Sequence, residues 1–373
     1  MKAALLTTPG QPLEIVDDIT IASPGHGQVK VRVCHCGLCH SDLSIADGAF
    51  PSLTPVVLGH EAAGVVEEVG PGVSGLAEGD HVVLTVCPPC GSCYWCVRGE
   101  QSLCVNALGI QTCSFPDGST GLQRGSEVIY RGVNLAAFAE YVLVQESGAV
   151  KIADDIPLDI ACVIGCAVQT GVGAVLNTAG VEEGATVLVA GLGGIGLSAV
   201  QGARIAGAAR IMVSDPVAER RAMAERFGAT DLIDPTTEDL FNRVVEITEV
   251  GVDYAFETAG RAALAEQVLG LVRNGGTVVC VGAAPIDESI NIGPEAVFTI
   301  SGKKILGCVL GSCNALRDIP RLVSLWQNGS LNLEDMITAH RPLAEINEAM
   351  DDLRASRGVR TVLDIWNQPT EKT

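Results

Sequence analysis

Hydrophobic and polar positions follow two different patterns along the chain. Residues 1 to about 150 contain short apolar segments interrupted by Gly and Pro, among them QVKVRV (28–33), EAAGVVEEV (61–69), DHVVLTV (80–86) and AEYVLV (139–144). Short segments of this kind, bounded by turn-forming residues, are typical of β-strands. The pattern predicts a compact β-rich domain, with residues 112–133, rich in Gly, Ser and Asp, as a long polar loop laid over it.

From about residue 184 the apolar runs recur at regular intervals. They are TVLVAG, RIMVSD, DLIDP, VDYAFE, TVVCVG and KILGCVLG. Helix-like segments such as VAERRAMAERFG separate the first five, and a loop through Pro294 joins the fifth to the sixth. Alternating strands and helices predict a parallel, doubly wound sheet, so the expected fold class is α/β. Two helical segments, IPRLVSLWQNG and LAEINEAMDDLRAS, and a last strand, RTVLDI, follow.

Composition and charge narrow the class of protein. The chain has 373 residues, enough for two domains with cores of their own. Hydrophobic residues make up 47% and charged residues 18%, which is typical of globular proteins. The formal net charge of −20 argues against nucleic acid and anionic membranes, because both bind basic surfaces. We therefore expect a soluble protein with small-molecule partners.

No secretory signal is predicted, because MKAALLTTPGQPLEIVDD has no sustained apolar core and no small-residue cleavage site. A cytoplasmic location is expected, and with it thiols or metal ligands rather than disulfides for the fourteen cysteines. The uncharged stretch 160–181 is long enough to span a membrane. Its four glycines and its polar Gln169, Thr170 and Asn177 favour a buried helix with flanking turns instead.

Five cysteines fall within eighteen positions in CPPCGSCYWCVRGEQSLC (87–104). They are Cys87, Cys90, Cys93, Cys96 and Cys104. A disulfide cluster, a redox Cys-x-x-Cys pair and a metal site all agree with this spacing. The spacing alone leaves the three alternatives open.

The first apolar run of the central part leads into GLGGIG, which places Gly191, Gly193 and Gly196 in the G-x-G-x-x-G pattern. These glycines permit a tight turn, close approach of a pyrophosphate, and close packing of helix on strand. The amino terminus of the following helix offers N–H groups and positive potential to phosphates. Because the motif follows a strand and opens a helix, we predict a dinucleotide-binding site.

Asp215 ends the next predicted strand. An acid at this place can accept hydrogen bonds from the adenosine ribose and repel a 2′-phosphate, so NAD is predicted rather than NADP. Two observations weigh against this interpretation. Asp215 also stands where it could cap a helix that begins at Pro216, and Arg220 and Arg221 are near enough in sequence to accommodate a phosphate.

Three further stretches accompany these motifs: CGLCHSDL (36–43), GHEAAGVV (59–66) and GCAVQTGVGAV (165–175). Together with GLGGIG and the cysteine cluster, they resemble the zinc-dependent alcohol dehydrogenases of the medium-chain dehydrogenase/reductase family, over essentially the whole chain. The resemblance implies a GroES-like β-rich catalytic domain with a structural zinc lobe, a Rossmann NAD-binding domain, and a carboxy-terminal part that completes the catalytic domain. The implied boundaries are 1–167, 168–309 and 310–373.

The resemblance also implies two zinc ions per chain. It places the catalytic zinc on Cys39, His60 and Cys166, a set of two thiolates and one imidazole that alcohol dehydrogenases use and that leaves the fourth position open. It places the structural zinc on all four cysteines of a closed site, namely Cys90, Cys93, Cys96 and Cys104. Cys87 is left over as a packing residue, and the disulfide and redox interpretations of the cluster lose their support.

Three side chains near the catalytic zinc have roles that the resemblance implies. Asp42 matches the carboxylate that hydrogen-bonds the ligand histidine, a contact that fixes its tautomer. Glu61 matches an acid that lies behind the metal, and Ser41 matches the first group of a proton relay. Relatives often carry a histidine three residues after that serine, and this chain has Ser44 there. The relay is therefore expected to end differently, in water for example.

Further residues match cofactor-binding positions of the family. His40 and Arg360 correspond to residues near the pyrophosphate, and Arg220 to a basic residue near the adenosine ribose. Thr170 and Ile195 correspond to positions that pack on the nicotinamide. With the glycine loop and Asp215, the full set expected to bind NAD is His40, Thr170, Gly191, Gly193, Gly194, Ile195, Gly196, Asp215, Arg220 and Arg360.

The implied reaction is NAD-linked oxidation of primary alcohols, aliphatic or aromatic, by hydride transfer from a zinc-bound alkoxide, and its reverse. Val86 replaces an aromatic residue of some relatives, which favours a bulky alcohol. The alternative is a thiol-dependent formaldehyde dehydrogenase. That branch has an arginine four residues after the last structural cysteine, where this chain has Leu108. A non-catalytic NAD-binding protein is disfavoured because all seven zinc ligands are present.

The resemblance to this family also bears on the oligomeric state. Residues 112–133 resemble an insertion found in dimeric branches, and KILGCVLG is expected at the edge of the sheet, where it can pair across a two-fold axis. A homodimer is therefore predicted.

Overall fold

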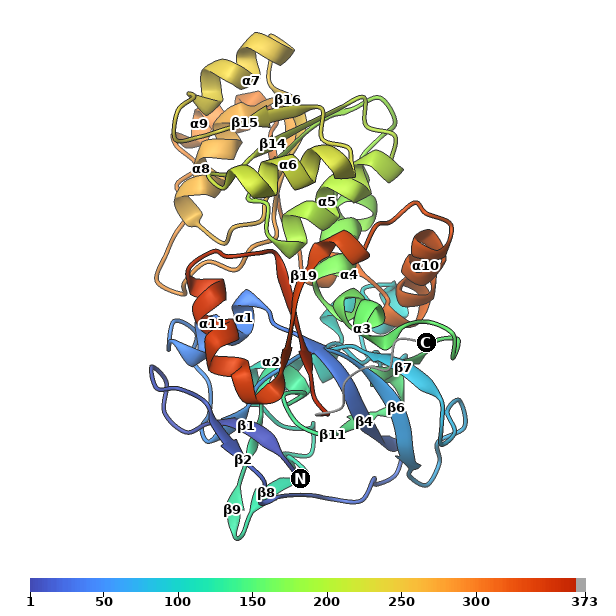
Figure 1. The fold of residues 1–373 in the computed structure, drawn as a ribbon. Coiled ribbons are helices and arrows are strands. Elements are labelled where there is room, and N and C mark those ends of the chain that lie inside the picture. The colour runs from blue at the N-terminus through green and yellow to red at the C-terminus, as the bar shows by residue number, and fades with distance from the viewer. Residues whose placement is uncertain (367–373) are drawn as a thin grey trace. The chain divides into compact units, whose positions relative to one another are not determined.

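A computed structural model describes residues 1–366 and divides the chain into two compact units. Among the described residues, the first consists of 1–166, 314–324 and 333–366, and the second of Ala167–Cys313 and Leu325–Asn332. The amino-terminal and carboxy-terminal parts of the chain thus share a unit, as Figure 1 shows for its blue and red segments. Residues 310–313 and 325–332 belong to the second unit.

The first unit is built from short strands. They are β1 (Ala3–Leu6), β2 (Glu14–Val16), β3 (Ile19–Ile21), β4 (Gln28–Gly37), β5 (Val56–Val57), β6 (Glu61–Val69), β7 (His81–Leu84), β8 (Leu122–Arg124), β9 (Glu127–Val128), β10 (Tyr130–Arg131), β11 (Tyr141–Gln145), β12 (Ala149–Lys151), β19 (Ile337–Pro342) and β20 (Arg360–Asp364). The largest sheet has the order β12-β7-β6-β4-β20-β19, with β11 also paired to β4. Along β4, inward residues such as Val29, Val31 and Val33 are fully buried, as the alternating pattern predicts.

Helices of the first unit are short. They are α1 (His40–Ala46), α2 (Gly109–Thr112), α3 (Leu158–Ala161) and α11 (Ile346–Arg354), while α10 (Ala315–Gln327) begins in the first unit and ends in the second. The carboxy-terminal strand β20 pairs antiparallel with β4 at Val362–Asp364, opposite His35–Gly37. This pairing brings residues more than 300 positions apart beside each other.

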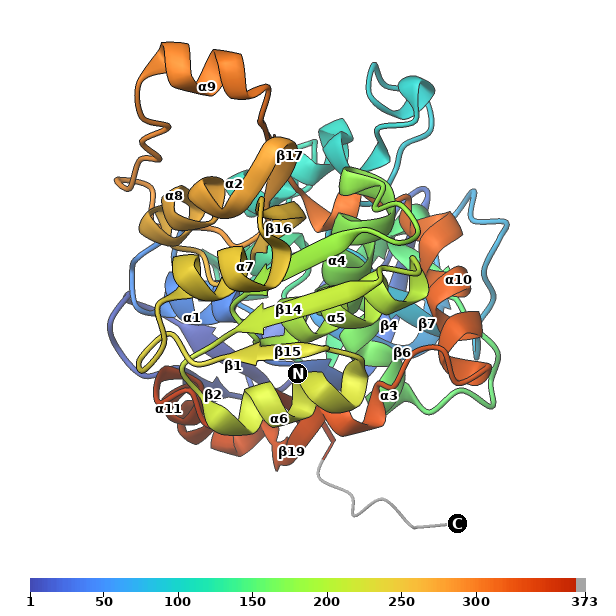
Figure 2. The same cartoon turned by 90° about the horizontal axis from the view of Figure 1, so that it is seen from above.

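The second unit is a parallel sheet with connecting helices around it (Figure 2). Its strands are β13 (Thr186–Ala190), β14 (Arg210–Ser214), β15 (Asp231–Ile233), β16 (Val252–Glu257), β17 (Val272–Cys280) and β18 (Lys304–Gly307). Its helices are α4 (Ala167–Gly173), α5 (Gly194–Ile205), α6 (Ala218–Phe227), α7 (Leu240–Thr248), α8 (Ala262–Leu271) and α9 (Glu295–Ser301).

The strand order β15-β14-β13-β16-β17-β18, all parallel, corresponds to 3-2-1-4-5-6, the Rossmann order. Residues 187–190 of β13 are completely buried, because helices cover both faces of a parallel sheet. The six apolar runs of the sequence thus become six neighbouring strands, which confirms the predicted fold class of a β-rich domain with a doubly wound sheet.

Two local expectations differ from the structure. Residues 112–133 are not one long polar loop, because β8 and β9 form a hairpin in this stretch that pairs with β3, and β10 pairs with β5. The hairpin is anchored by Leu122, which is 3% exposed. Residues 160–181 are helical and largely buried, as predicted, but the helix breaks at Cys166.

The break at Cys166 separates a 3₁₀ turn, Cys162–Gly165, from α4, which continues into a π-helix at Ala174–Ala179. Among the described residues, no single helix is long and apolar enough to cross a membrane; the segments 158–165 and 167–179 meet the test only as a pair, with a bend of 52° between them.

Candidate metal and cofactor sites

The carboxylate of Asp42 organises the turn in which Cys39 lies. Cys39 is the N-cap of α1, and its backbone N–H donates to Asp42 Oδ2 at 3.2 Å. The other oxygen, Oδ1, accepts from the Gly59 N–H at 2.9 Å and contacts His60 Nδ1 at 3.0 Å. Asp42 is fully buried, so these three N–H groups take the place of water around its charge.

His60 lies between β5 and β6 and is 1% exposed. A carboxylate only accepts hydrogen bonds, so the contact with Asp42 requires the proton on Nδ1. The lone pair of the neutral ring is then on Nε2, the nitrogen that remains for a metal. Asp42 thereby sets the tautomer of His60 and the start of α1 at once.

Cys166 reaches this place because the chain is irregular there. Its backbone has φ −138° and ψ −75°, between the 3₁₀ turn 162–165 and α4. The turn packs closely against β7, since a Cβ on Gly165 would lie 2.5 Å from the Leu84 carbonyl oxygen. The structure brings Cys39, His60, Glu61 and Cys166 together, with one ligand atom from each lying within 4.8 Å of the others.

This set of side chains fits a zinc ion. Around a tetrahedral zinc with thiolate and imidazole ligands, ligand atoms lie about 3.3 to 3.8 Å apart, within the observed limit. Both Glu61 carboxylate oxygens are buried and make no hydrogen bond among the described residues, and the cation beside them is Arg360. The fit to zinc therefore rests on the donor geometry and on the chemistry of two thiols and one imidazole.

Ionisation in the group is strongly coupled. A hydrogen bond with the Cys166 thiol holds the pKa of Cys39 well below its usual range, and the charge of His60 adds to this. The same hydrogen bond, with burial, raises the pKa of Cys166 well above its usual range. Burial opposes the charged form of His60, but Asp42 and Cys39 outweigh it and raise the pKa of His60. The group can therefore exchange protons for a dication.

Glu61 is the first residue of β6 and lies beside Arg360 of β20. Arg360 Nε is 3.4 Å from Glu61 Oε2, too poorly aligned for a hydrogen bond, and Arg360 Nη1 donates to the Leu38 carbonyl at 2.6 Å. Burial raises the pKa of Glu61 to about 7, against the charge of Arg360. Gly37, opposite Glu61 in the β4–β6 pairing, leaves the space for this acid, because a Cβ there would lie 2.4 Å from Glu61 Oε2.

Ser41 and His40 occupy the first turn of α1. The Ser41 hydroxyl is 3.9 Å from Cys39 Sγ, beside the ligand group. His40 is exposed, and Ser44 is half-buried on the next turn of the same helix. Of the residues predicted for proton transfer, Ser41 is thus the one that the structure brings to the ligand group.

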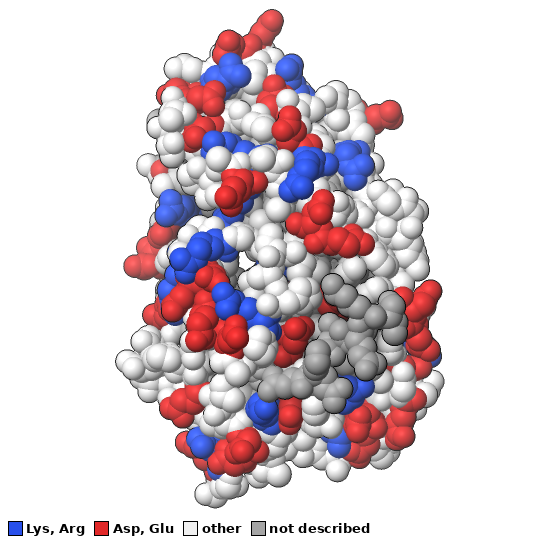
Figure 3. Space-filling model, viewed as in Figure 1, with Lys and Arg blue, Asp and Glu red and all other residues white. Residues whose placement is uncertain are grey.

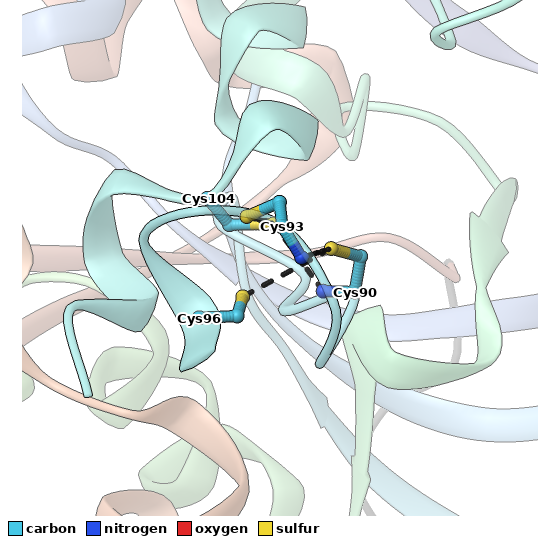
Figure 4. A group of neighbouring side chains, drawn as sticks. All are labelled: Cys90, Cys93, Cys96 and Cys104. Atoms are coloured by element: carbon cyan, nitrogen blue, oxygen red, sulfur yellow. Dashed lines mark hydrogen bonds between the residues drawn. The ribbon is translucent and has the colours of Figure 1, made fainter. Parts of the chain in front are cut away.

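The four predicted structural ligands converge in one lobe of the first unit (Figure 4). Cys90 Sγ and Cys96 Sγ lie 4.0 Å apart, and Cys93 Sγ and Cys104 Sγ 3.9 Å apart. With Zn–S bonds of about 2.3 Å, tetrahedral sulfurs lie about 3.8 Å apart, so the cluster fits zinc. Cys87, predicted as the spare cysteine, does not belong to the group and is 4% exposed.

Backbone amides help this cluster to hold thiolates. The N–H groups of Cys93 and Cys90 point to Cys90 Sγ (3.3 Å) and Cys104 Sγ (3.2 Å). Amide donors from Cys96 and Val105 lower the pKa of Cys93 to about 6, whereas burial raises the pKa of Cys104 to about 12. A metal is therefore needed to hold all four sulfurs deprotonated together at neutral pH.

In the second unit, the glycine loop joins β13 to α5. Gly191 has φ +94°, and its N–H donates to the Ser214 carbonyl at 2.8 Å, which ties the loop to β14. A Cβ on Gly196 would lie 1.9 Å from the Gly191 carbonyl oxygen, so the helix packs directly on the turn. Around Gly193, the N-cap of α5, nothing lies within 4 Å of the Cβ position. Gly194, with no side chain, is the first residue of α5.

Asp215 anchors this loop. Its Oδ2 accepts from the Leu192 N–H at 2.7 Å, and its Oδ1 accepts from the Val217 N–H at 2.8 Å. Arg221 donates to the Asp215 carbonyl and to Asp234, at 2.6 and 2.8 Å. Asp215 thus has a structural role in the unit beside the ribose contact predicted for it. Its neighbour Arg220 is half-buried near the start of α6.

Thr170 and Ile195 lie on α4 and α5 of the same unit. Thr170 is 5% exposed and Ile195 is half-buried. Helices α4 and α5 approach closely at these residues, because a Cβ on Gly171 would lie 2.3 Å from the Ile195 carbonyl oxygen.

Sequence reasoning missed two residues that position these sites. One is Gly37, which stands in the stretch CGLCHSDL but was given no role there. The other is Asn134, which is 6% exposed and donates from Nδ2 to the Val86 carbonyl (2.8 Å) and the Asn106 carbonyl (3.1 Å). Asn134 thereby ties the segment after Cys104 to the predicted substrate residue Val86. It stands at φ +65°, a conformation that a sequence does not reveal.

Two models of known protein families match separate parts of the chain. Residues 25–154 match the family model of the alcohol dehydrogenase GroES-like domain, and residues 194–328 that of the zinc-binding dehydrogenases. The probable S-(hydroxymethyl)glutathione dehydrogenase 1 of Schizosaccharomyces pombe is 36% identical over 372 residues, covering 99% of this chain and 97% of that protein. This chain belongs to the zinc-dependent medium-chain alcohol dehydrogenase family.

Two more relatives support the assignment to this dehydrogenase family. The NDMA-dependent alcohol dehydrogenase of Amycolatopsis methanolica is 37% identical over 97% of this chain and 98% of its own length. The solved structure of benzyl alcohol dehydrogenase from Acinetobacter calcoaceticus matches with a TM-score of 0.92 and 32% identity, over 98% of this chain and 99% of that one. The protein is an oxidoreductase of the alcohol dehydrogenase family.

Removal of Asp42 tests its control of the dehydrogenase's buried zinc site. Asp42→Ala leaves Nδ1 of His60 without its acceptor, so we expect zinc affinity at Cys39–His60–Cys166 to fall about 10- to 100-fold. Competition with a chelator, followed by metal analysis, should leave one zinc per chain in the variant and two in the wild type. Asp47→Ala, which removes an exposed carboxylate paired with Arg354 after α1, is the control and should retain both ions.

A second test concerns the glycine loop of the dehydrogenase. Gly196→Ala would force the added Cβ against the Gly191 carbonyl, and we expect NADH affinity to fall about tenfold or more, as a loss of about 1.4 kcal/mol gives. Fluorescence titration of NADH measures this. Gly270→Ala is the matched control, because nothing lies within 4 Å of its Cβ position in α8. Equal affinities of the two variants would contradict the assignment of the loop.

Proposed function

We propose that this dehydrogenase oxidises free primary alcohols, aliphatic or aromatic, to aldehydes with NAD as hydride acceptor, and catalyses the reverse reaction. The observation that carries the proposal is the buried group of Cys39, His60 and Cys166, in which Asp42 sets the tautomer of His60. A zinc ion in such a site supplies Lewis-acid chemistry at an alcohol or carbonyl oxygen. Cys39, His60 and Cys166 would hold such an ion in this chain.

The chain's own groups then have distinct tasks. Oxidation removes a hydride from the alcohol carbon and a proton from its oxygen. Ser41, whose hydroxyl lies 3.9 Å from Cys39 Sγ, is the first acceptor for that proton. Asp42 keeps His60 oriented, and Glu61 with Arg360 forms a buried pair of charges on the ligand group. Ser44 stands where relatives often have a histidine, so we expect water to take the proton onward.

Binding of NAD rather than NADP is supported by the acid at position 215. A carboxylate there disfavours a 2′-phosphate, and Arg221 is already engaged with Asp234. Gly191, Gly193, Gly194 and Gly196 form the pyrophosphate turn, and Thr170 and Ile195 face the same cofactor in this proposal. His40, Arg220 and Arg360 are proposed as phosphate or ribose contacts. Arg360 then serves two partners, since it also pairs with Glu61.

Free alcohols are favoured over glutathione adducts because the lobe that carries Leu108 has no available cation. Leu108 is 57% exposed, where the glutathione branch carries an arginine. Of the three basic residues of 87–135, Arg98 pairs with Glu100 and Arg124 pairs with Asp18, while Arg131 is only 2% exposed and so is not accessible at the surface of the lobe. A glutathione adduct carries two carboxylates that such cations would bind.

The alternative function is thiol-dependent formaldehyde oxidation. It is supported by the 36% identity over nearly the whole chain to a probable S-(hydroxymethyl)glutathione dehydrogenase. Another relative is named for its dependence on NDMA, so an added electron acceptor belongs in any assay.

Steady-state kinetics of the zinc-loaded protein tests whether free alcohols or glutathione adducts are the better substrates. We expect kcat/KM for hexanol or benzyl alcohol to exceed that for S-hydroxymethylglutathione at least about tenfold. Leu108→Arg should raise kcat/KM for the glutathione adduct about tenfold, as one charge-assisted contact gives, and leave benzyl alcohol nearly unchanged. Leu103→Arg, on the same lobe, is the control. Turnover only with thiol adducts would establish the alternative, and turnover only with NDMA would show that the cofactor stays bound.

A homodimer through the edge of the second unit's sheet is also proposed. Strand β18 pairs only with β17, which leaves its other edge open within the described residues. Large apolar side chains are exposed on the neighbouring stretch: Ile286, Ile290, Ile292, Val297, Ile300 and Val309. An open strand edge flanked by exposed apolar residues is suited to pairing with a second copy.

Sedimentation equilibrium checks the dimer. The wild type is expected at twice the chain mass, and Ile300→Glu should weaken association at least about tenfold, because a carboxylate would be desolvated in the interface. Val250→Glu, at a similarly exposed residue before β16, should leave the dimer intact. A wild-type tetramer or monomer would contradict this proposal without affecting the reaction.

A further inference from the structure

Arg131 is a buried cation without a counterion. It is the last residue of β10 and is 2% exposed. Its Nη2 donates to the carbonyl oxygens of Asn134 and Leu143, both at 2.8 Å. Its Nη1 is buried and has no hydrogen-bond partner among residues 1–366, and no carboxylate of these residues forms an ion pair with it. One N–H donor group of the guanidinium is therefore unsatisfied.

The surroundings compensate the charge only in part. The ring of Phe115 lies over the guanidinium, with its centroid 3.6 Å from the central carbon. A ring face attracts a cation, but more weakly than an anion does. Burial lowers the pKa of Arg131 to about 9, and no neighbouring acid opposes this. Arginine keeps its proton near neutral pH even so, and a buried, unpaired charge strongly disfavours the folded state.

A small cavity lies against Arg131. It offers about 10 Å³ to the centre of a water-sized particle, about the space that one water or one small ion needs. Arg131, Thr85, Asn134 and Phe115 are among its walls. Thr85 is 1% exposed; its hydroxyl oxygen accepts from the Cys87 N–H, and its own proton reaches no acceptor in the described chain. Two unused donors thus belong to residues that line one cavity.

The cavity adjoins a wider surface groove of about 450 Å³, since Asn106, Phe115, Pro116 and Gln145 line both. Two acids, Asp117 and Glu146, line the outer groove but not the inner cavity. Asp117 Oδ1 accepts from Ser119, and Glu146 Oε1 accepts from the amides of Ser74 and Gly75. Both carboxylates thus accept hydrogen bonds from other residues, and neither of them lines the cavity next to the Arg131 guanidinium.

We propose that this cavity binds one monovalent inorganic anion of the halide class, which accepts a hydrogen bond from Arg131 Nη1 and balances the buried positive charge. A carboxylate or phosphate is too large for the space. A water molecule fills it but leaves the charge unpaired. Asn106, which follows the cysteine cluster, and Gln145 of β11 line the site, and none of the predicted catalytic-zinc ligands does. It makes the stability of this protein depend on the kind of anion present.

Thermal unfolding of the zinc-loaded protein tests the proposal in sodium chloride and sodium gluconate at equal ionic strength. A ligand of the native state stabilises by mass action, so above half-saturation the wild-type midpoint should rise roughly 2 to 4 °C per tenfold increase in chloride. Arg131→Met should lose this dependence. Arg341→Met is the control, because Arg341 has carboxylate partners in Glu345 and Asp352, and it should keep the chloride response.

Crystals of the wild type soaked in bromide give a test that needs no variant, which matters if Arg131→Met fails to fold. An anomalous peak within hydrogen-bond distance of Arg131 Nη1 is expected. A water molecule there in place of bromide, equal midpoints in chloride and gluconate, or an unchanged chloride response in a folded Arg131→Met would each overturn the proposal.

Discussion

The catalytic half of this protein depends on three hydrogen bonds to one buried carboxylate. Asp42 receives the N–H groups of Cys39, Gly59 and His60. The first belongs to the start of α1 and the other two to the turn before β6, so one side chain fixes the relative position of two predicted zinc ligands. Burial makes these bonds strong, because water does not compete, and makes them necessary, because an unpaired carboxylate would be unstable there.

The third ligand depends on a different constraint. Cys166 is held by a break between two helical segments, and the turn before it packs against β7 through Gly165. It is also the last residue of the first unit's amino-terminal portion. A regular helix through this position would turn the side chain elsewhere. The non-helical backbone of Cys166 is thus the local condition under which a predicted ligand so distant in sequence lies beside the other two.

Much of the fold could be predicted because its elements carry local signals. The six apolar runs from TVLVAG to KILGCVLG became six neighbouring parallel strands, of which the inner ones, such as β13, are buried and the edge strand β18 is partly exposed. The cysteines at 90, 93, 96 and 104 are close in sequence and converge in space. By contrast, Cys166 lies 106 residues after His60, and no spacing rule reaches it. Residues 112–133 were predicted as a loop because a short polar hairpin has the composition of a loop. Strand β19 was not predicted because ITAHRP lacks an alternation of apolar and polar residues.

The pairing of β4 with β6 couples the choice of residue at position 37 to the choice at position 61. The acid occupies the volume that any side chain at position 37 would need. A change at either position alone should therefore destabilise the protein. A side chain at position 37 would displace the Glu61 carboxylate. A smaller residue at position 61 would leave Arg360 buried beside an empty space. Across the family, the two positions should consequently vary together or not at all, although they lie 24 positions apart in the chain.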